Sequence, residues 1–229
     1  MSEVMLNKVF EEVGREHGYD SITAEFGVFK EFKVKWKRSM GWAEFEVSDY
    51  LKGAPEEVLR DLAEMIFDRI GRKPNAERKA FKNYVATSEF LENTRPKFLA
   101  RSRNMSHTTE GESKDLLDSY RRLIDMGLVE EDKDIVFTWT LKDNRRKLAN
   151  TSVLMKVITI SRRLDGEMVP DCLLDYVLYS QLLNIEDGFD PMRGDESKEE
   201  RKSKLREFPQ REEAEKMLKK IGGGLDESE

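Results

Sequence analysis

The segment 153–188 constrains the fold of this chain more than any other part of the sequence. Its first part, VLMKVITISRRL, is rich in β-branched residues and predicts a strand. Only one lysine and one threonine interrupt the apolar run at its start, which is typical of a central strand covered on both faces. Pro170 and Asp171 then open the most apolar helix of the chain, which Gly188 closes.

The rest of the chain predicts further helices and a hairpin. Apolar residues at helical spacing predict helices at 4–17, 55–70, 76–93 and 114–125, with 94–113 as a loop or short helix. Alternating apolar and charged residues predict strands at 32–37 and 43–47, and β-branched and aromatic residues predict a strand at 135–140. The first two strands form a hairpin that sets lysines beside glutamates, worth a few tenths of a kcal/mol per pair. The sequence shows no internal repeat.

These elements predict one α+β domain over residues 1–221. A mixed sheet of about three to five strands packs on the apolar helix, and residues 72–130 form a helical insertion. The segment 193–221 is highly charged, with apolar residues at intervals, and predicts a charged C-terminal helix. The last residues, 222–229, are expected to be disordered.

The composition excludes several classes of protein. One cysteine, Cys172, forms neither an internal disulfide nor a cysteine-rich zinc site, and it favours a reducing, cytoplasmic compartment. Two histidines, His17 and His107, are too few and too far apart for the usual histidine-rich zinc site. No stretch has the roughly 20 apolar residues of a membrane helix, so no membrane partner is expected. The net charge of −6 gives no global reason to expect nucleic acid.

Three polar residues, Ser180, Gln181 and Asn184, stand out on the apolar helix. They form the pattern S-Q-x-x-N, in which positions i and i+4 share a face and i+1 lies beside them. This is the register of H-E-x-x-H in zincins, where two histidines hold zinc and the glutamate polarises water. Alternatively, the three side chains line a solvent-facing edge of the helix.

The stretch MKVITISRRLDGEMVPDCLLDYVLYSQLLNIEDGFDP, residues 155–191, resembles SprT-like and YgjP-like zinc metallopeptidases, the minigluzincin group, in their archaeal type. In that group a strand ends in I-S, a turn carries L-D and V-P, and the helix reads roughly DYVLYHELLH. The hairpin with WKRS and the closing FPQREEAEKMLKKI fit the same order. The resemblance implies a zincin-like fold, with Ser180 and Asn184 at ligand positions and Gln181 at the general-base position.

The departures from the family pattern predict a catalytically inactive relative, a pseudoenzyme. Serine and asparagine are poor zinc ligands, and glutamine has no carboxylate to accept a proton. No histidine follows His107 to act as the family's downstream third ligand. We therefore expect no bound metal, no cofactor and no catalytic residues. A residual metal-dependent hydrolase remains the lesser alternative, with ligands among Glu186, Asp187, Asp190 and His107.

A peptide- or protein-binding role is the expected positive function, with an unknown peptide or protein as partner. Zincins commonly hold an extended substrate along a sheet edge, and loss of the metal leaves that edge in place. Tyr176, Tyr179 and Trp139 are candidates to line such a groove, although core packing is the alternative for each aromatic side chain.

Nucleic-acid binding is the competing hypothesis. The segment 113–141 has the helix, glycine and strand order found at the end of winged-helix modules. A basic cluster surrounds Phe98, and its members are Arg95, Lys97, Arg101 and Arg103. Acidic residues at 130, 131, 132 and 134 stand where a wing would approach phosphates, and they argue against this hypothesis.

Overall fold

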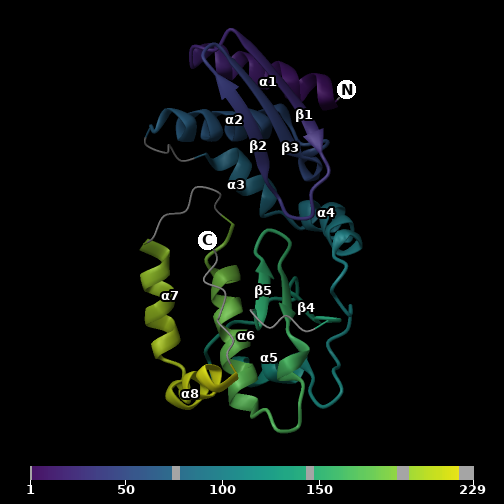
Figure 1. Cartoon of the computed structure of the whole chain (residues 1–229), viewed down its shortest axis with the longest axis vertical. Coiled ribbons are helices and arrows are strands. Elements are labelled where there is room, and N and C mark those ends of the chain that lie inside the picture. The colour runs from purple at the N-terminus through teal and green to yellow at the C-terminus, as the bar shows by residue number, and fades with distance from the viewer. Residues whose placement is uncertain (1, 74–77, 143–146, 190–195, 222–229) are drawn as a thin grey trace. The chain divides into compact units, whose positions relative to one another are not determined.

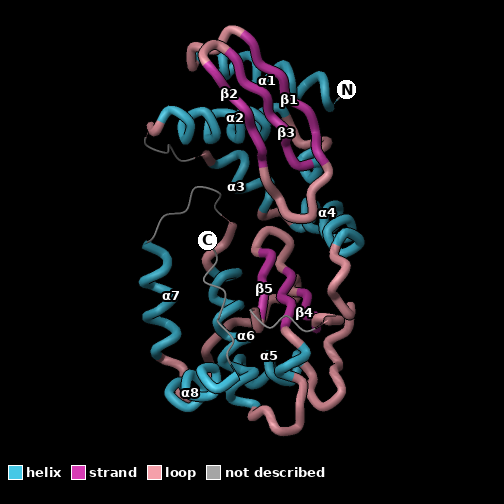
Figure 2. The backbone as a smooth tube through the Cα atoms, viewed as in Figure 1, coloured by secondary structure: helices cyan, strands magenta, loops and turns pink. Residues whose placement is uncertain are grey.

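The computed structural model describes residues 2–73, 78–142, 147–189 and 196–221, and it has an α+β fold (Figures 1 and 2). The chain divides into two compact units, Met1–Arg101 and Ser102–Glu229, which we call unit 1 and unit 2. Each contains one three-stranded mixed sheet in its described part. The α+β class is therefore confirmed. The boundary between the units falls inside the segment 72–130 that was expected as an insertion, and a single-domain organisation stays a prediction.

Unit 1 is an α-β-β-β-α arrangement followed by two short helices. Its elements are α1 (Ser2–Glu16), β1 (Ser21–Gly27), β2 (Val34–Ser39), β3 (Trp42–Ser48), a 3-10 turn (Asp49–Leu51), α2 (Glu56–Gly71), α3 (Lys79–Val85) and α4 (Ser88–Arg101). The sheet order is β1-β3-β2, with β1 parallel and β2 antiparallel to β3. The helices near 4–17 and 55–70 and the hairpin are confirmed. Strand β1 was not predicted. Helix α4 continues through Pro96 to Arg101, within the segment 94–113 that was expected as a loop or short helix.

The core of unit 1 lies between one face of its sheet and the helices α1 and α2. Phe10 of α1 and Phe67 of α2 contact Phe45 of β3, with ring centroids 5.0 and 5.2 Å apart. The other face of the sheet is exposed, and there Lys35 lies opposite Glu46 and Lys37 opposite Glu44. The cross-strand pairing of lysine with glutamate is thus confirmed.

Unit 2 has the same kinds of elements around a smaller sheet. They are α5 (Leu116–Asp125), β4 (Val136–Trp139), β5 (Ala149–Ser152), β6 (Val157–Ile160), a 3-10 turn (Arg162–Leu164), α6 (Asp171–Glu186), α7 (Glu196–Arg206) and α8 (Arg211–Ile221). The order is β4-β6-β5, so β6 is central as predicted. The strand expected over 153–164 is shorter, because residues 153–156 form a turn in which Lys156 has a φ of 50°. That turn joins β6 to β5, which was not predicted.

The two units repeat one topology, although the sequence shows no repeat. In both, a helix precedes three strands, and the third strand lies in the middle, parallel to the first and antiparallel to the second. In both, that middle strand leads through a buried serine, a 3-10 turn of three residues and a glycine to a 16-residue helix with proline at its N-cap. The sequences FEVSDYLKGAPEEVL and ITISRRLDGEMVPDCLL carry these features.

The repeated segment has a clear physical basis. Proline is favoured at the start of a helix because its missing N–H is not needed there. Leu51 and Leu164 each end a 3-10 turn, and each is fully buried beneath the connection. Two extra residues lengthen the second connection, which hides the similarity from inspection of spacing alone.

The charged segment expected at 193–221 forms two helices, α7 and α8, separated at Phe208-Pro209. Phe208 is buried, and its ring lies 5.3 Å from that of Tyr176 in α6. Residues 222–229 lie outside the described residues. Across the described ranges, no helix combines the length and the apolar character needed to cross a membrane.

Replacing Trp139 by alanine tests the core of unit 2. Trp139 is fully buried, so Trp139→Ala should lower the free energy of unfolding by about 3–5 kcal/mol. Trp42, which is 40% exposed on the sheet of unit 1, is the matched control, and Trp42→Ala should cost much less. Urea unfolding followed by circular dichroism measures both; equal losses would contradict the assignment of the core.

Candidate functional site

The S-Q-x-x-N residues lie on the buried side of α6, not on a solvent-facing edge. Ser180, Gln181 and Asn184 are 7%, 1% and 8% exposed. The alternative of a solvent-facing helix edge is therefore wrong. Every residue from Leu173 to Ile185 is buried, since the sheet, α5, α7 and α8 all pack around this helix.

Hydrogen bonds within the chain use the polar groups of Ser180 and Gln181. The Thr151 hydroxyl of β5 donates to Gln181 Oε1 at 2.9 Å, and Gln181 Nε2 donates to Ser180 Oγ, also at 2.9 Å. Ser180 Oγ in turn donates to the carbonyl oxygen of Val177 at 2.7 Å. A buried amide needs such partners, since a lost hydrogen bond there costs about 1–3 kcal/mol. The chain of bonds therefore ties α6 to the edge strand β5.

A cationic side chain from α7 contacts the second of the motif's ligand positions. The Arg201 guanidinium donates to Asn184 Oδ1, and its Nε lies 3.2 Å from Asp187 Oδ2. One turn further along α7, Lys204 Nζ lies 2.6 Å from Glu186 Oε1. These pairs hold α7 against the C-terminal end of α6 and place a positive charge at Asn184.

The described members of the alternative ligand set, Glu186, Asp187 and His107, are not brought together into one site. Glu186 and Asp187 pair with the basic residues of α7, and Asp190 lies outside the described residues. His107 sits in a loop with a φ of 62°, and its backbone N–H donates to Thr138 Oγ1 at 2.9 Å. In the part of the chain that the structure describes, no group of three or more His, Cys, Asp or Glu residues could hold a metal ion.

The three aromatic residues expected to line a groove are instead packed into the core. Trp139 is fully buried and donates from Nε1 to the carbonyl oxygen of Thr109 at 2.7 Å. Tyr176 and Tyr179 are 3% and 2% exposed, and both rings pack against Phe208. All three side chains belong to the hydrophobic core of unit 2, as the alternative of core packing has it. The helices α7 and α8 cover the two tyrosines on α6.

Burial also changes the acidity of these tyrosines. Desolvation, with the nearby Glu215 carboxylate as a second cause, raises the pKa of Tyr176 to about 12. The Tyr176 hydroxyl donates to Glu215 Oε1 at 3.1 Å. Burial likewise raises the pKa of Tyr179. Both phenols are therefore held in the neutral form well above physiological pH.

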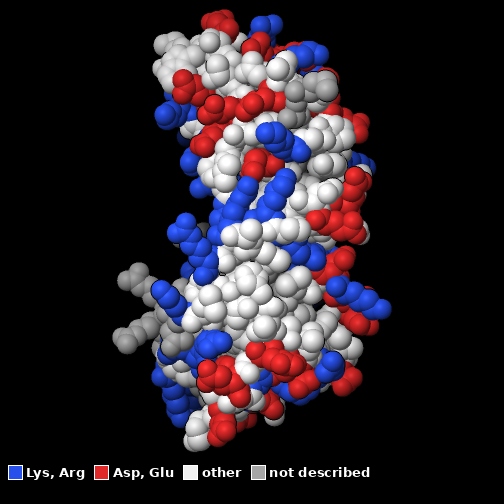
Figure 3. All heavy atoms as spheres, turned by 90° about the vertical axis from the view of Figure 1, so that its right-hand side faces the viewer, with Lys and Arg blue, Asp and Glu red and all other residues white. Residues whose placement is uncertain are grey.

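The members of the basic cluster are divided between the two units. Arg101 makes a bidentate ion pair with Asp49, at 2.8 and 2.6 Å, and that hydrogen bonding raises the pKa of Arg101. Arg95 and Lys97 belong to unit 1, whereas Arg103 belongs to unit 2. On the face shown in Figure 3, acidic side chains lie beside basic ones on both units.

The segment 113–141 lacks the hairpin of a winged-helix module. Its one described strand, β4, runs parallel to β6, whereas a wing is an antiparallel hairpin. In the acidic loop before β4, Asp132 pairs with Lys156 at 2.8 Å. The described residues of this segment therefore contain no wing, and nucleic-acid binding stays a prediction.

No protein-family model, curated protein or solved structure matches this chain. The function is therefore inferred from the geometry of the chain itself.

Two residues that complete the site, Thr151 and Arg201, were not predicted from the sequence. Thr151 lies on a strand that was not predicted, and Arg201 is one of many basic residues in the charged tail. Only contacts across the fold distinguish them. The repeat also offers a comparison, because counting from the N-cap prolines places Met65, Ile66 and Arg69 of α2 where α6 has the motif residues.

The substitution Gln181→Glu tests the buried hydrogen-bond network. The introduced carboxyl would have its pKa raised by burial, so its ionised form should destabilise the fold by several kcal/mol at pH 7. Because its folded pKa lies above the unfolded value of about 4.3, this deficit should shrink as the pH falls from the folded pKa towards that value, and its ionic part should be absent below it. Urea unfolding at pH 7 and pH 4 measures the effect. Gln210→Glu, which makes the same change at an exposed glutamine, serves as control. A pH-independent deficit in Gln181→Glu would contradict the assignment.

The raised pKa of Tyr176 predicts a loss of stability at alkaline pH. The neutral phenol of Tyr176 stabilises the fold fully at a pH below 10.0, the pKa of an unfolded tyrosine. This stabilisation is lost as the pH rises from 10.0 to about 12. Tyr176→Phe should therefore flatten the fall of unfolding free energy over this range. Absorbance at 295 nm measures phenol ionisation. If unfolding free energy falls with pH as steeply in Tyr176→Phe as in the native chain, the prediction is contradicted.

Proposed function

We propose that this chain is a catalytically inactive, metallopeptidase-like protein with a zincin-like fold, whose role is to bind a peptide or protein. The observation that carries the proposal is the state of the motif positions. Ser180, Gln181 and Asn184 are buried and bonded within the chain, and the Arg201 guanidinium lies on Asn184.

The residues at these positions do not fit a zinc ion. Ser180 Oγ already donates to a carbonyl and accepts from an amide, and Asn184 Oδ1 accepts from a cation. Neutral hydroxyl and amide oxygens are weak zinc ligands, and the adjacent guanidinium adds electrostatic repulsion. Gln181 carries no group that accepts a proton from water. Zinc-dependent hydrolysis is therefore not part of the proposed function.

The resemblance of residues 155–191 to minigluzincins supports the peptidase-like origin. In unit 2 the segment forms a strand, a short turn and a helix in the order that the resemblance implies. The motif helix packs against β5 and β6, and Gln181 bonds to β5. An exposed sheet edge can bind an extended peptide through backbone groups alone, so the proposed role does not need zincin chemistry.

Metal analysis of the native, tag-free protein tests the inactive half of the proposal. We expect far less than one zinc per chain and no cleavage of an unstructured substrate such as casein. Stoichiometric zinc with zinc-dependent cleavage would overturn it.

A reconstruction tests the zincin-like scaffold separately. The triple variant carries Ser180→His, Gln181→Glu and Asn184→His, and the quadruple variant adds Arg201→Ala. The quadruple variant should bind zinc at least about tenfold more tightly than the triple variant, because the positive charge of Arg201 repels the ion. Met65→His with Arg69→His, at the equivalent positions of α2, controls for any helical histidine pair. Equal affinity in all three proteins would contradict the scaffold assignment.

A further inference from the structure

Strand β2 of unit 1 is an open edge of its sheet. At the opposite edge, α1 covers β1, where the backbone N–H of Ala24 donates to Asn7 Oδ1 at 2.9 Å. At β2 the antiparallel ladder continues from a hydrogen bond between Ser48 N and Lys33 O, 3.1 Å long. The odd-numbered residues of β2 therefore bond to β3, and alternation turns the backbone groups of Val34, Trp36 and Arg38 outward.

These outward groups lack a partner in the described chain. Among the described residues, no other segment makes a backbone hydrogen bond to the outer side of β2. The strand has six residues, Val34–Ser39, and five of them are exposed. Its length is enough to pair with a peptide of similar length.

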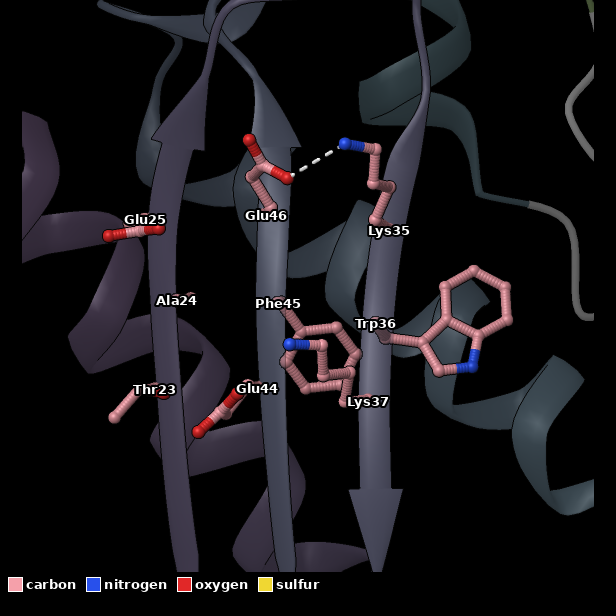
Figure 4. A pocket seen from close by; sticks show the side chains of 9 residues that line it. All are labelled: Thr23, Ala24, Glu25, Lys35, Trp36, Lys37, Glu44, Phe45 and Glu46. Atoms are coloured by element: carbon pink, nitrogen blue, oxygen red, sulfur yellow. Dashed lines mark hydrogen bonds and ion pairs between the residues drawn. The ribbon is translucent and has the colours of Figure 1, made fainter.

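The side chains along this edge combine positive charge with one exposed aromatic ring. Lys35 and Lys37 stand on the outer face of the sheet, above a hollow of about 680 Å³ that they share with Glu44 and Glu46. Trp36 is 37% exposed and points past the outer side of β2 (Figure 4). Basic groups thus lie on one side of the free edge and an apolar surface on the other.

We propose that β2 binds an extended acidic peptide of a partner protein by strand addition, which deepens and rests on the peptide-binding role proposed above. The peptide backbone bonds to Val34, Trp36 and Arg38. Its acidic side chains face Lys35 and Lys37, and an apolar side chain between them contacts Trp36, because successive residues of a strand point to opposite faces. The sheet then gains a fourth strand.

Charge argues against two other occupants of this edge. A second copy of the chain would bring Lys35, Lys37 and Arg38 against the same residues, and like charges on paired strands destabilise each other. Nucleic acid lying over the outer face would bring phosphates beside Glu44 and Glu46. The side chains of a strand added at β2 instead meet Lys35 and Lys37 directly and lie one strand further from those glutamates. Edge lysines also discourage pairing with neutral strands, so they make an acidic sequence the requirement for binding.

A labelled peptide tests the proposal on the full chain. The probe is a capped octapeptide of alternating glutamate and valine carrying fluorescein, and anisotropy measures binding. Lys35→Glu with Lys37→Glu should weaken binding at least about tenfold. Lys52→Glu with Lys73→Glu, which changes two other exposed lysines of unit 1 and keeps the same net charge, should leave binding unchanged.

A modified peptide tests the backbone bonds without altering the protein. N-methyl groups on the amides that face β2 should weaken binding to the native chain, whereas the same groups on the opposite amides should not. On the protein side, Arg38→Pro removes one outward N–H and should weaken binding more than Arg38→Ala, with thermal unfolding as the check on folding.

Several results would overturn strand addition at β2. One is that a lysine–valine octapeptide binds as tightly as the glutamate–valine peptide. Another is that single-stranded oligothymidine competes with the peptide. A third is that sedimentation shows a dimer of the chain that Lys35→Glu with Lys37→Glu abolishes. A peptide selected from a display library that still binds the Lys35 and Lys37 variant would overturn this site but leave the proposed function standing. Failure of such libraries to yield any bound peptide would overturn the proposed function itself.

Discussion

Complete burial of α6 is the constraint on which unit 2 depends. This helix is apolar on nearly all sides, so the sheet, α5, α7 and α8 must each cover part of it. Every polar side chain that remains on it then needs a partner, because an unpaired buried group costs about 1–3 kcal/mol. Asp175 bonds to Ser119 and to Arg122 of α5, Gln181 bonds to β5, and Asn184 bonds to α7.

The same constraint shapes the proposed function. The positions that would hold a metal and a general base in a zincin now help to position the elements around α6. The Ser180–Gln181–Thr151 bonds join helix to sheet, and Arg201 joins helix to tail. Side chains that are engaged in this way stabilise the fold and are withdrawn from solvent. The surface open to a partner is consequently elsewhere, and the exposed edge of β2 is the place where backbone hydrogen-bonding groups face outward.

The repeated topology gives the chain two versions of one structural segment with different surroundings. In unit 1 the equivalent helix, α2, packs with α1 over a single sheet face, and its outer residues are charged and exposed. In unit 2 the helix is enclosed, and the sheet strands shorten to four residues each. The long, charged strands of unit 1 leave a usable edge. In unit 2, Thr151 of the edge strand β5 is engaged by α6.

Strong local patterns made much of the fold predictable. The helix at 55–70, the lysine–glutamate hairpin, the central position of β6 and the break at Phe208-Pro209 each follow from periodicity, proline placement or charge within a few residues. Strands β1 and β5 were missed because each has an alternation too short or too polar to predict a strand without its partner. The internal repeat was missed because its halves share geometry and few identical residues.

At the candidate site, too, the local features were predictable from the sequence and the contacts between distant residues were not. The sequence by itself determined that Ser180, Gln181 and Asn184 occupy one register on an apolar helix, and that neither histidine nor carboxylate stands there, because helical spacing is a local property. Tertiary structure alone decided that Thr151 and Arg201 satisfy those side chains, that three aromatic rings belong to the core, and that β2 has a free edge. Contacts between residues far apart in the chain decide these outcomes, and no local pattern specifies them.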